Sequence, residues 1–210
     1  MLNEGEGVTV LFLATHLNTG GITSYLLTLS KGLIRCGHNV HIVTSGGNME
    51  ASFSSIGVKV LNLNIRTKSE LSPKIYKTLG TLCDYVRDHN IDIIHSHTRI
   101  TQVMGVLLKR MTGKPFLSTC HGFFKTRLSR KFFPCWGDAV IAISNPVASH
   151  LMDDFNIPSQ KVSLITNGID IEEFGSISEE TKKTLRKRFL AVIPRMIVII
   201  IVFFIYFVFG

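Results

Sequence analysis

Acidic side chains are missing from the C-terminal end of this 210-residue sequence, where residues 181–210 contain none. The formal net charge of +8 would suggest a nucleic-acid-binding protein, but six of the 23 Lys and Arg residues lie in that end segment. Residues 1–180 hold the other 17 basic side chains against 15 acidic ones. Because the body of the protein is nearly neutral, we predict no nucleic acid partner.

Cysteine is scarce, and the four cysteines are widely spaced, without a C-x-x-C pair. This spacing disfavours a zinc knuckle or a disulfide framework and is typical of reduced, structural thiols. The N-terminal residues also lack the basic segment of a secretory signal peptide. We therefore predict a cytoplasmic protein.

A dinucleotide-binding fingerprint is missing as well. The glycines after the first apolar run do not follow the spacing G-x-G-x-x-G. The second run ends in VTSGG, without the Asp or Glu that would hold a ribose hydroxyl. Both observations disfavour a site for NAD or a similar dinucleotide.

Short apolar runs alternate with stretches of helical periodicity along most of the chain. We expect strands at residues 8–14, 38–44, 58–64, 91–97, 114–120, 138–144 and 161–167. We expect helices at 21–36, 72–89, 99–111 and 145–155, with Gly37 and Gly113 ending two of them at positive φ. Nearly continuous apolar strands linked by helices indicate a parallel sheet covered on both faces. The predicted fold class is α/β, with a doubly wound, mostly parallel, Rossmann-like sheet.

The pattern changes after Phe174, so we predict one domain over residues 1–175 and an appendage over 176–210. Residues 177–190 read as a polar, basic helix. The run from Met196 to Phe209 is entirely apolar, but a bilayer span needs about 20 residues. This hydrophobic C-terminal tail is therefore borderline as a membrane anchor.

Gly20 and Gly21 lie between the first expected strand and the first expected helix. One interpretation is a helix cap built from Asn18, Thr19 and the glycines. The other is a turn that lets the backbone approach a phosphate or a sugar hydroxyl. In a doubly wound sheet, ligands bind beyond the carboxyl ends of the strands, which favours the second interpretation.

Histidines end the fourth and fifth expected strands. His95 and His97 share one face of their strand, and His121 lies between a strand end and Gly122. A metal site formed by the three histidines would suit a metal-dependent hydrolase, but no carboxylate lies near them in sequence. We predict no metal, and hydrogen-bonding or packing roles for His95 and His97. His121 is the candidate for contact with a substrate hydroxyl.

Two further stretches carry turn or charge signals. Asn167 and Gly168 follow the seventh expected strand and predict a tight turn with positive φ. Residues 121–136 interleave basic and aromatic side chains, as in an amphipathic helix. Such a helix would contact an anionic membrane surface, or else expose a basic face over buried aromatic side chains.

Taken together, four motifs resemble one known family. They are the glycine pair, IIHSH at 93–97, STCHGFF at 118–124, and the stretch AISNPVASHLMDDFNIPSQKVSLITNGIDIEEF at 142–174. This set is similar to the N-terminal domain of the family-four retaining glycosyltransferases, which have the two-domain GT-B fold. The resemblance covers roughly residues 7–175, and its last motif is the most specific.

The resemblance implies transfer of a sugar from a UDP- or GDP-linked donor to a glycan or lipid-linked acceptor, with retention and without a metal or other cofactor. It implies that Gly20 and Gly21 face the donor diphosphate and the acceptor. His121 would contact the transferred sugar, and Asn167 and Gly168 would lead toward the interdomain cleft. Backbone N–H groups suit this role because they stabilise a departing diphosphate without a metal.

The sequence departs from the family after the NGID turn, where the nucleotide-binding domain should begin. We interpret the chain as a truncated or frameshifted product that is inactive alone. The alternative is a non-enzymatic domain, tethered to the inner face of the membrane by its tail, that pairs with a separate donor-binding subunit.

Overall fold

The computed structural model describes residues 7–67, 69–126, 130, 132–170, 179–184, 186 and 187. The chain divides into two compact units, Met1–Gly168 and Ile169–Gly210. The predicted boundary at residue 175 and the apolar run from Met196 to Phe209 lie outside the described residues. In the second unit, residues 179–184, 186 and 187 are helical, as predicted. No helix within the described ranges is both long and apolar enough to cross a membrane.

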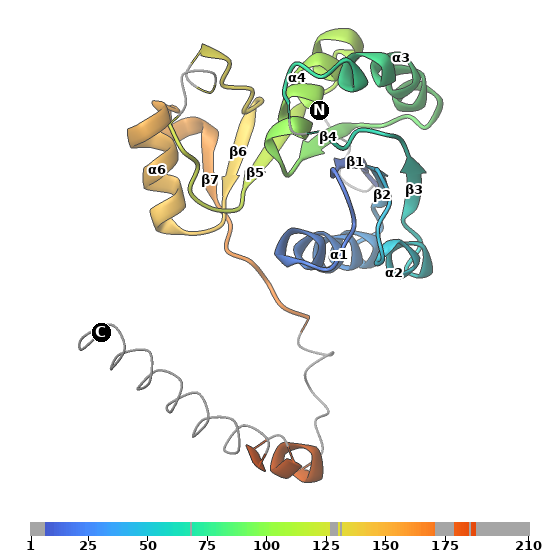
Figure 1. The fold of residues 1–210 in the computed structure, drawn as a ribbon, viewed down its shortest axis with the longest axis vertical. Coiled ribbons are helices and arrows are strands. Elements are labelled where there is room, and N and C mark those ends of the chain that lie inside the picture. Colours follow the sequence, from blue (N-terminus) through green and yellow to red (C-terminus); the bar gives the residue numbers. More distant parts are fainter. Residues whose placement is uncertain are drawn as a thin grey trace, which may run out of the picture. The chain divides into compact units, whose positions relative to one another are not determined.

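The first unit contains a seven-stranded parallel sheet in the order β3-β2-β1-β4-β5-β6-β7 (Figure 1). The strands are β1 (Thr9–Leu13), β2 (Asn39–Thr44), β3 (Lys59–Asn62), β4 (Ile93–Ser96), β5 (Phe116–Cys120), β6 (Ala139–Ala142) and β7 (Val162–Leu164). Each strand lies inside one of the predicted runs. The predicted α/β, doubly wound parallel sheet is therefore confirmed.

Helices connect most of the strands. They are α1 (Gly21–Arg35), α2 (Glu50–Ser55), α3 (Pro73–Asp88), α4 (Arg99–Thr112), α6 (Asn145–Phe155) and the 3-10 helix η1 (Ser159–Lys161). The four predicted helices agree with α1, α3, α4 and α6 to within one residue at each end. The sequence missed α2 because its six residues are too few for a helical period to show.

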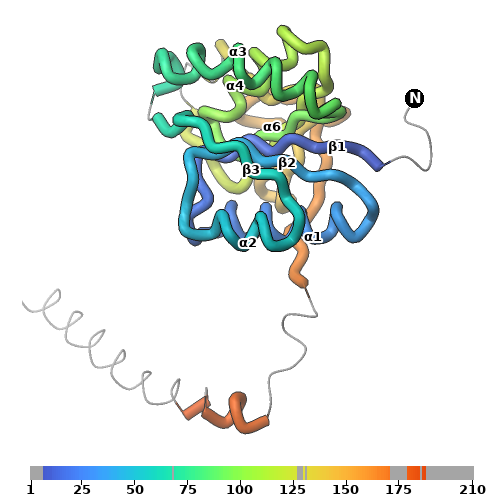
Figure 2. The backbone as a smooth tube through the Cα atoms, turned by 90° about the vertical axis from the view of Figure 1, so that its right-hand side faces the viewer, coloured from blue at the N-terminus to red at the C-terminus, as the bar shows by residue number. Residues whose placement is uncertain are grey.

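Strand β1 is buried on both faces, which explains why it is apolar without alternation. Val10 and Phe12 pack on the side of α1 and α2, whereas Leu11 and Leu13 pack on the side of α3 and α4. Figure 2 shows these two helical layers on opposite faces of the sheet. A third cluster joins β5 and β6 to α6.

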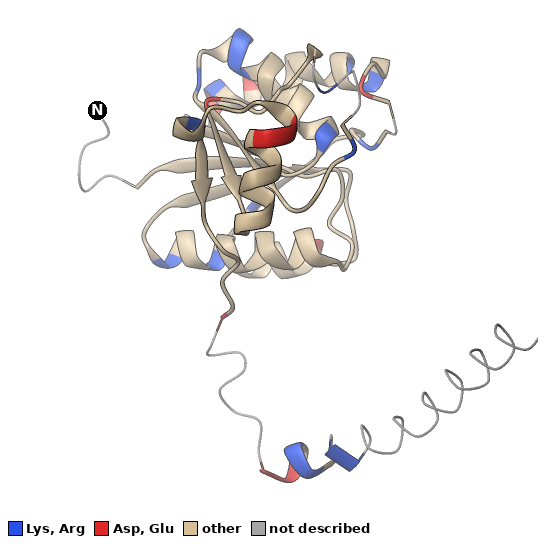
Figure 3. Cartoon of the chain, turned by 90° about the vertical axis from the view of Figure 1, so that its left-hand side faces the viewer, with Lys and Arg blue, Asp and Glu red and all other residues tan. Residues whose placement is uncertain are grey.

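Two glycines end helices with positive φ, as predicted: Gly37 at 82° and Gly113 at 73°. Basic and acidic residues are interspersed along the described helices and loops in the view of Figure 3. This distribution agrees with the near-neutral charge of the body.

The order of the strands fixes where a ligand can bind. β1 lies between β2 and β4, so the chain leaves β1 toward one edge of the sheet and later returns to its other side. At such a switch point the loops that follow the two central strands diverge and leave a crevice. Here those loops follow β1 and β4, and β5 is the next strand along.

Candidate functional site

The loop after β1 carries Gly20 and Gly21 to the start of α1. Gly20 is the N-cap residue, and its carbonyl accepts a hydrogen bond from the Ser24 N–H at 2.9 Å. No side chain caps this helix, and its first turn contains no acidic residue. Both glycines are exposed. The first N–H groups of α1 are thus left without a side-chain cap at an exposed position, and uncapped helix N-termini of this kind attract anions.

Neither the backbone conformation nor the packing of the described residues requires glycine at these two positions. The φ of Gly20 is 167°, an extended value that any residue adopts. A Cβ at Gly20 would approach only the Asn18 carbonyl, at 3.8 Å, and a Cβ at Gly21 would meet no atom within 4 Å. The space that the glycines leave is therefore available to a ligand.

The loop is held by the segment that follows β2. Asn48 Oδ1 accepts a hydrogen bond from the Thr19 backbone N–H at 2.9 Å, and Asn48 Nδ2 donates to Thr19 Oγ1 at 3.0 Å. The Asn48 backbone N–H donates to Asn18 Oδ1 at 3.4 Å. The Asn18 and Thr19 side chains therefore do not cap α1, and that part of the cap interpretation is wrong.

Gly47 lets the two loops come together. A Cβ at Gly47 would overlap the Leu17 carbonyl group and the Asn18 backbone nitrogen. This contact between the two loops was not predicted from the sequence, where VTSGG served only to disfavour a dinucleotide site. Its signal was the second glycine pair, Gly46 and Gly47, at the corresponding end of the neighbouring strand.

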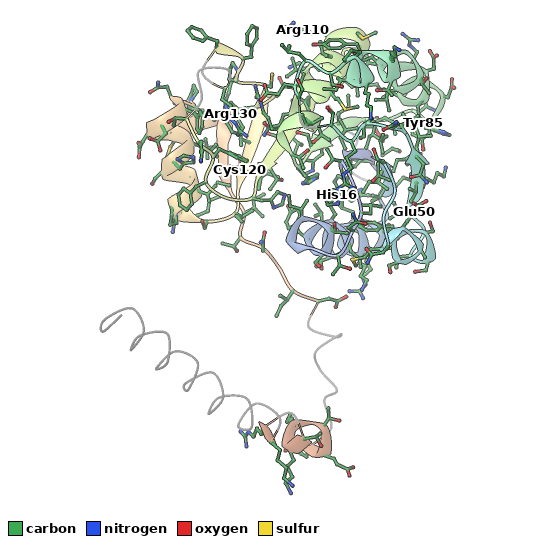
Figure 4. All side chains as sticks on the ribbon, viewed as in Figure 1. His16, Glu50, Tyr85, Arg110, Cys120 and Arg130 are labelled. Carbon is green, nitrogen blue, oxygen red and sulfur yellow. The ribbon has the colours of Figure 1, made fainter. Side chains whose placement is uncertain are left out.

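The ends of β4 and β5 bring three histidines together. His97 Nδ1 lies 3.2 Å from His121 Nε2, and His95 Nε2 lies 2.8 Å from Thr119 Oγ1. The rings of His95 and His97 are 4.2 Å apart, and the edge-to-face contacts of both with Phe12 place them on one face, as predicted. Cys120, which immediately precedes His121, is labelled in Figure 4.

Tyr25 connects the histidines to the loop that carries Gly20 and Gly21, which we call the glycine loop. Its ring lies 4.8 Å from the His121 ring, edge to face, and its hydroxyl group lies close to the Thr119 side chain. Tyr25 lies one helical turn after Gly21, so both come from the start of α1. Tyr25 and Thr119 were not predicted from the sequence. The i, i+4 spacing from Gly21 and the i, i+2 spacing to His121 could have identified them.

Burial keeps these histidines neutral. It lowers the pKa of His95 to about 3 and that of His121 to about 4. Burial, together with the neighbouring His95 and His121, also holds the pKa of His97 well below its ordinary value. At pH 7 the cluster therefore contributes N–H donors and nitrogen acceptors rather than positive charge.

The described residues give no sign that the three histidines are arranged as metal ligands. Across the described ranges, no group of three or more His, Cys, Asp or Glu side chains is arranged to hold a metal ion. His97 and His121 instead direct one ring nitrogen each toward the other. The hydrolase interpretation gains no support from this part of the chain.

Asn167 and Gly168 do not join this cluster. They follow β7, the edge strand, and β4, β5 and β6 separate that strand from β1. Both residues are exposed in an extended segment, and neither has a positive φ. The predicted tight turn is therefore wrong. The reason is that no strand returns after β7 in the described residues, so nothing requires the chain to reverse there.

The basic, aromatic stretch is only partly described. Residues 122–126 contain no helix, which corrects the expectation for this part, whereas Arg130 and Phe132 are helical and residues 127–129 and 131 lie outside the description. The Phe124 backbone N–H donates to His150 Nε2 at 3.0 Å, which ties residue 124 to α6. Phe123, Phe132 and Phe133 are 68%, 75% and 69% exposed.

The sequence model of Glycosyltransferase Family 4 matches residues 19–173, a range that includes the glycine loop and all three histidines. The chain belongs to Glycosyltransferase Family 4. An uncharacterized glycosyltransferase of Methanocaldococcus jannaschii is 25% identical over 189 residues, which cover 80% of this chain and 47% of that protein. The Escherichia coli UDP-Gal:alpha-D-GlcNAc-diphosphoundecaprenol alpha-1,3-galactosyltransferase is 28% identical over 113 residues, or 48% of this chain and 29% of that one.

Solved glycosyltransferase structures have the same fold as this chain. A glycosyltransferase from Rickettsia africae has a TM-score of 0.73 at 22% identity, over 87% of this chain and 49% of that chain. Anabaena HepE in complex with UDP-glucose has a TM-score of 0.67 at 19% identity, over 86% of this chain and 49% of that chain. The chain spans about half the length of these relatives, and its sheet corresponds to the N-terminal half of a GT-B fold.

Proposed function

We propose that the glycine loop and His121 form the acceptor-side half of a site that transfers a sugar from a nucleotide sugar to a glycan or lipid-linked acceptor, with retention. The observation that carries this proposal is the open N-terminus of α1 at Gly20 and Gly21, one turn from the tyrosine that contacts His121. Its N–H groups would stabilise the negative charge of the departing diphosphate. His121 would hydrogen-bond a hydroxyl group of the transferred sugar.

A UDP- or GDP-linked sugar is the donor class that we propose. The UDP-glucose complex of Anabaena HepE and the UDP-galactose specificity named for the E. coli relative favour UDP. The exposed segment at Asn167 and Gly168 would lead toward a second, nucleotide-binding half. Because one half of a cleft supplies only part of the binding energy, we expect the 210-residue chain alone to give no transfer.

The test has a binding arm and a turnover arm. Titration of the purified chain with UDP-glucose, UDP-galactose and GDP-mannose, followed by NMR, should perturb the backbone N–H signals of residues 20–24. Gly21→Val should abolish that response because its side chain enters the ligand space, whereas Gly32→Val in the same helix should keep it. Radiolabelled donors should show no transfer. Perturbation elsewhere would contradict the proposed site, and turnover would contradict the need for a second half.

We also propose a cytoplasmic location, at the inner face of a membrane that carries a lipid-linked acceptor. The exposed Phe123, Phe132 and Phe133 and the basic Lys125 would contact that surface. Flotation of residues 1–180 with anionic vesicles should recover bound protein. Replacing Phe132 and Phe133 with Ser should reduce the bound fraction, and equal binding by both proteins would contradict this contact.

A further inference from the structure

His97 is buried to 2% exposure, and its Nδ1 faces the imidazole of His121, the proposed substrate contact. His97 immediately follows β4 and His121 immediately follows β5, and these strands are neighbours in the parallel sheet. The two nitrogens that face each other are 3.2 Å apart, which is hydrogen-bond distance. One of them must carry a proton, and the other must offer a lone pair.

Two tautomer assignments satisfy this bond. If His121 donated from Nε2, the His97 proton would lie on His97 Nε2. That atom is buried, and it has no hydrogen-bond partner among the described residues. A buried N–H without an acceptor is rarer in proteins than an unpaired acceptor, because its desolvation is uncompensated. The geometry therefore favours His97 as the donor, through Nδ1–H.

This assignment determines the state of His121. With Nε2 accepting from His97, the proton of the neutral His121 ring is on Nδ1. None of the described residues hydrogen-bonds His121 Nδ1, and His121 is only partly buried. The His121 ring also packs against the Tyr25 ring, with the centroids 4.8 Å apart, and against the His97 ring, with the centroids 5.5 Å apart.

We propose that His97 is a positioning residue that fixes His121 as the Nδ1–H tautomer and so makes His121 a hydrogen-bond donor to an oxygen of the bound sugar. The inference rests on the proposed function for the identity of the ligand, but the tautomer itself is a property of the free protein. In this arrangement His97 never touches the substrate. It selects which nitrogen of His121 can donate.

Long-range ¹H–¹⁵N correlation NMR of the 210-residue chain with ¹⁵N-labelled histidine measures the tautomer at pH 7. The His121 signals are assigned by their loss in His121→Gln. We expect a protonated Nδ1 and an unprotonated Nε2 on His121. A protonated Nε2 would overturn the proposal, and this measurement needs no substitution at the buried site.

Variants of His97 then test whether His97 determines the tautomer of His121. His97→Asn places an amide donor near the position of Nδ1 and should keep the Nδ1–H tautomer of His121. His97→Phe removes the donor and should shift His121 toward the Nε2–H form, while His41→Phe, on a distant part of the sheet, should leave it unchanged. Circular dichroism checks that each variant is folded. A His121 tautomer that is the same in folded His97→Phe as in the original chain would overturn the proposal.

A ligand arm separates this inference from the proposed function. If UDP-glucose binds, His97→Asn should bind within about twofold of the original chain, and His97→Phe about tenfold more weakly, as for one lost hydrogen bond. Equal loss in both variants would overturn the tautomer role. No binding by the original chain would count against the proposed function, while the tautomer of His121 would still be read from the free protein.

Discussion

Asn48 holds Thr19 by two hydrogen bonds, one to the backbone N–H at 2.9 Å and one to the side-chain hydroxyl group at 3.0 Å. Thr19 directly precedes Gly20, so this pair sets the position of the glycine loop from the neighbouring strand-end loop. An exposed asparagine thus connects the end of β2 to the open N-terminus of α1.

Asn48→Ala should therefore loosen the glycine loop without unfolding the protein. The Thr19 amide loses its acceptor, so we expect hydrogen–deuterium exchange at Thr19 to become at least several-fold faster. The loss of global stability should be about 1 kcal/mol because the bonds are exposed. Asn64→Ala, whose side chain makes one long bond to Lys74, is the matched control. Unchanged exchange at Thr19 would mean that the loop is rigid by itself.

Two glycines inside helices should respond to alanine in opposite directions. In α4, a Cβ at Gly105 would overlap the ring of Phe116, which is 1% exposed in β5. We expect Gly105→Ala to destabilise by about 2 kcal/mol, since overpacking forces the helix away from the sheet. In α3, a Cβ at Gly80 meets nothing within 4 Å, so Gly80→Ala should stabilise by up to about 1 kcal/mol. Urea unfolding measures both. Equal effects would contradict the close α4–β5 packing.

Stability should fall on the acid side of neutrality. Burial lowers the pKa of His41 and His121 to about 4 and that of His95 to about 3, below the ordinary value of 6.5. As the pH falls below 6.5, the unfolded chain binds protons that the folded chain excludes. Each group then lowers the free energy of unfolding by up to about 1.4 kcal/mol per pH unit, until the pH reaches the pKa of that group in the folded protein. The free energy of unfolding, measured with urea between pH 8 and 4.5, should be constant above pH 7 and should fall steeply below it. A free energy of unfolding that stays constant below pH 6.5 would contradict the burial of His41, His95 and His121.

The C-terminal residues should limit solubility. The uncharged, β-branched run from Met196 to Phe209 is an aggregation hazard if it is exposed. Residues 1–180 should therefore yield more soluble protein than the full chain, as measured by the supernatant fraction after centrifugation. Equal yields would indicate that the run is covered.

The alternation of apolar runs and helical stretches was enough to predict the parallel sheet and four of its helices. It worked because each strand is buried on both faces and each long helix has one apolar side. The same reasoning failed at Asn167 and Gly168, where a dipeptide with strong turn preference lies in an extended segment. Local propensity decides a turn only when the chain must reverse, and that condition depends on the strand that follows.

The sequence by itself determined the class of the fold, the family and the candidate positions Gly20, Gly21 and His121, because periodicity and motif spacing are local properties. Tertiary structure decided the rest. It brought His97 to His121, Tyr25 to Thr119 and Asn48 to Thr19, pairs that are 24, 94 and 29 residues apart in the chain. Their contact depends on which strands are neighbours and on how the loops at the switch point pack. Both follow from the global minimum of burial and hydrogen bonding rather than from any short stretch of residues.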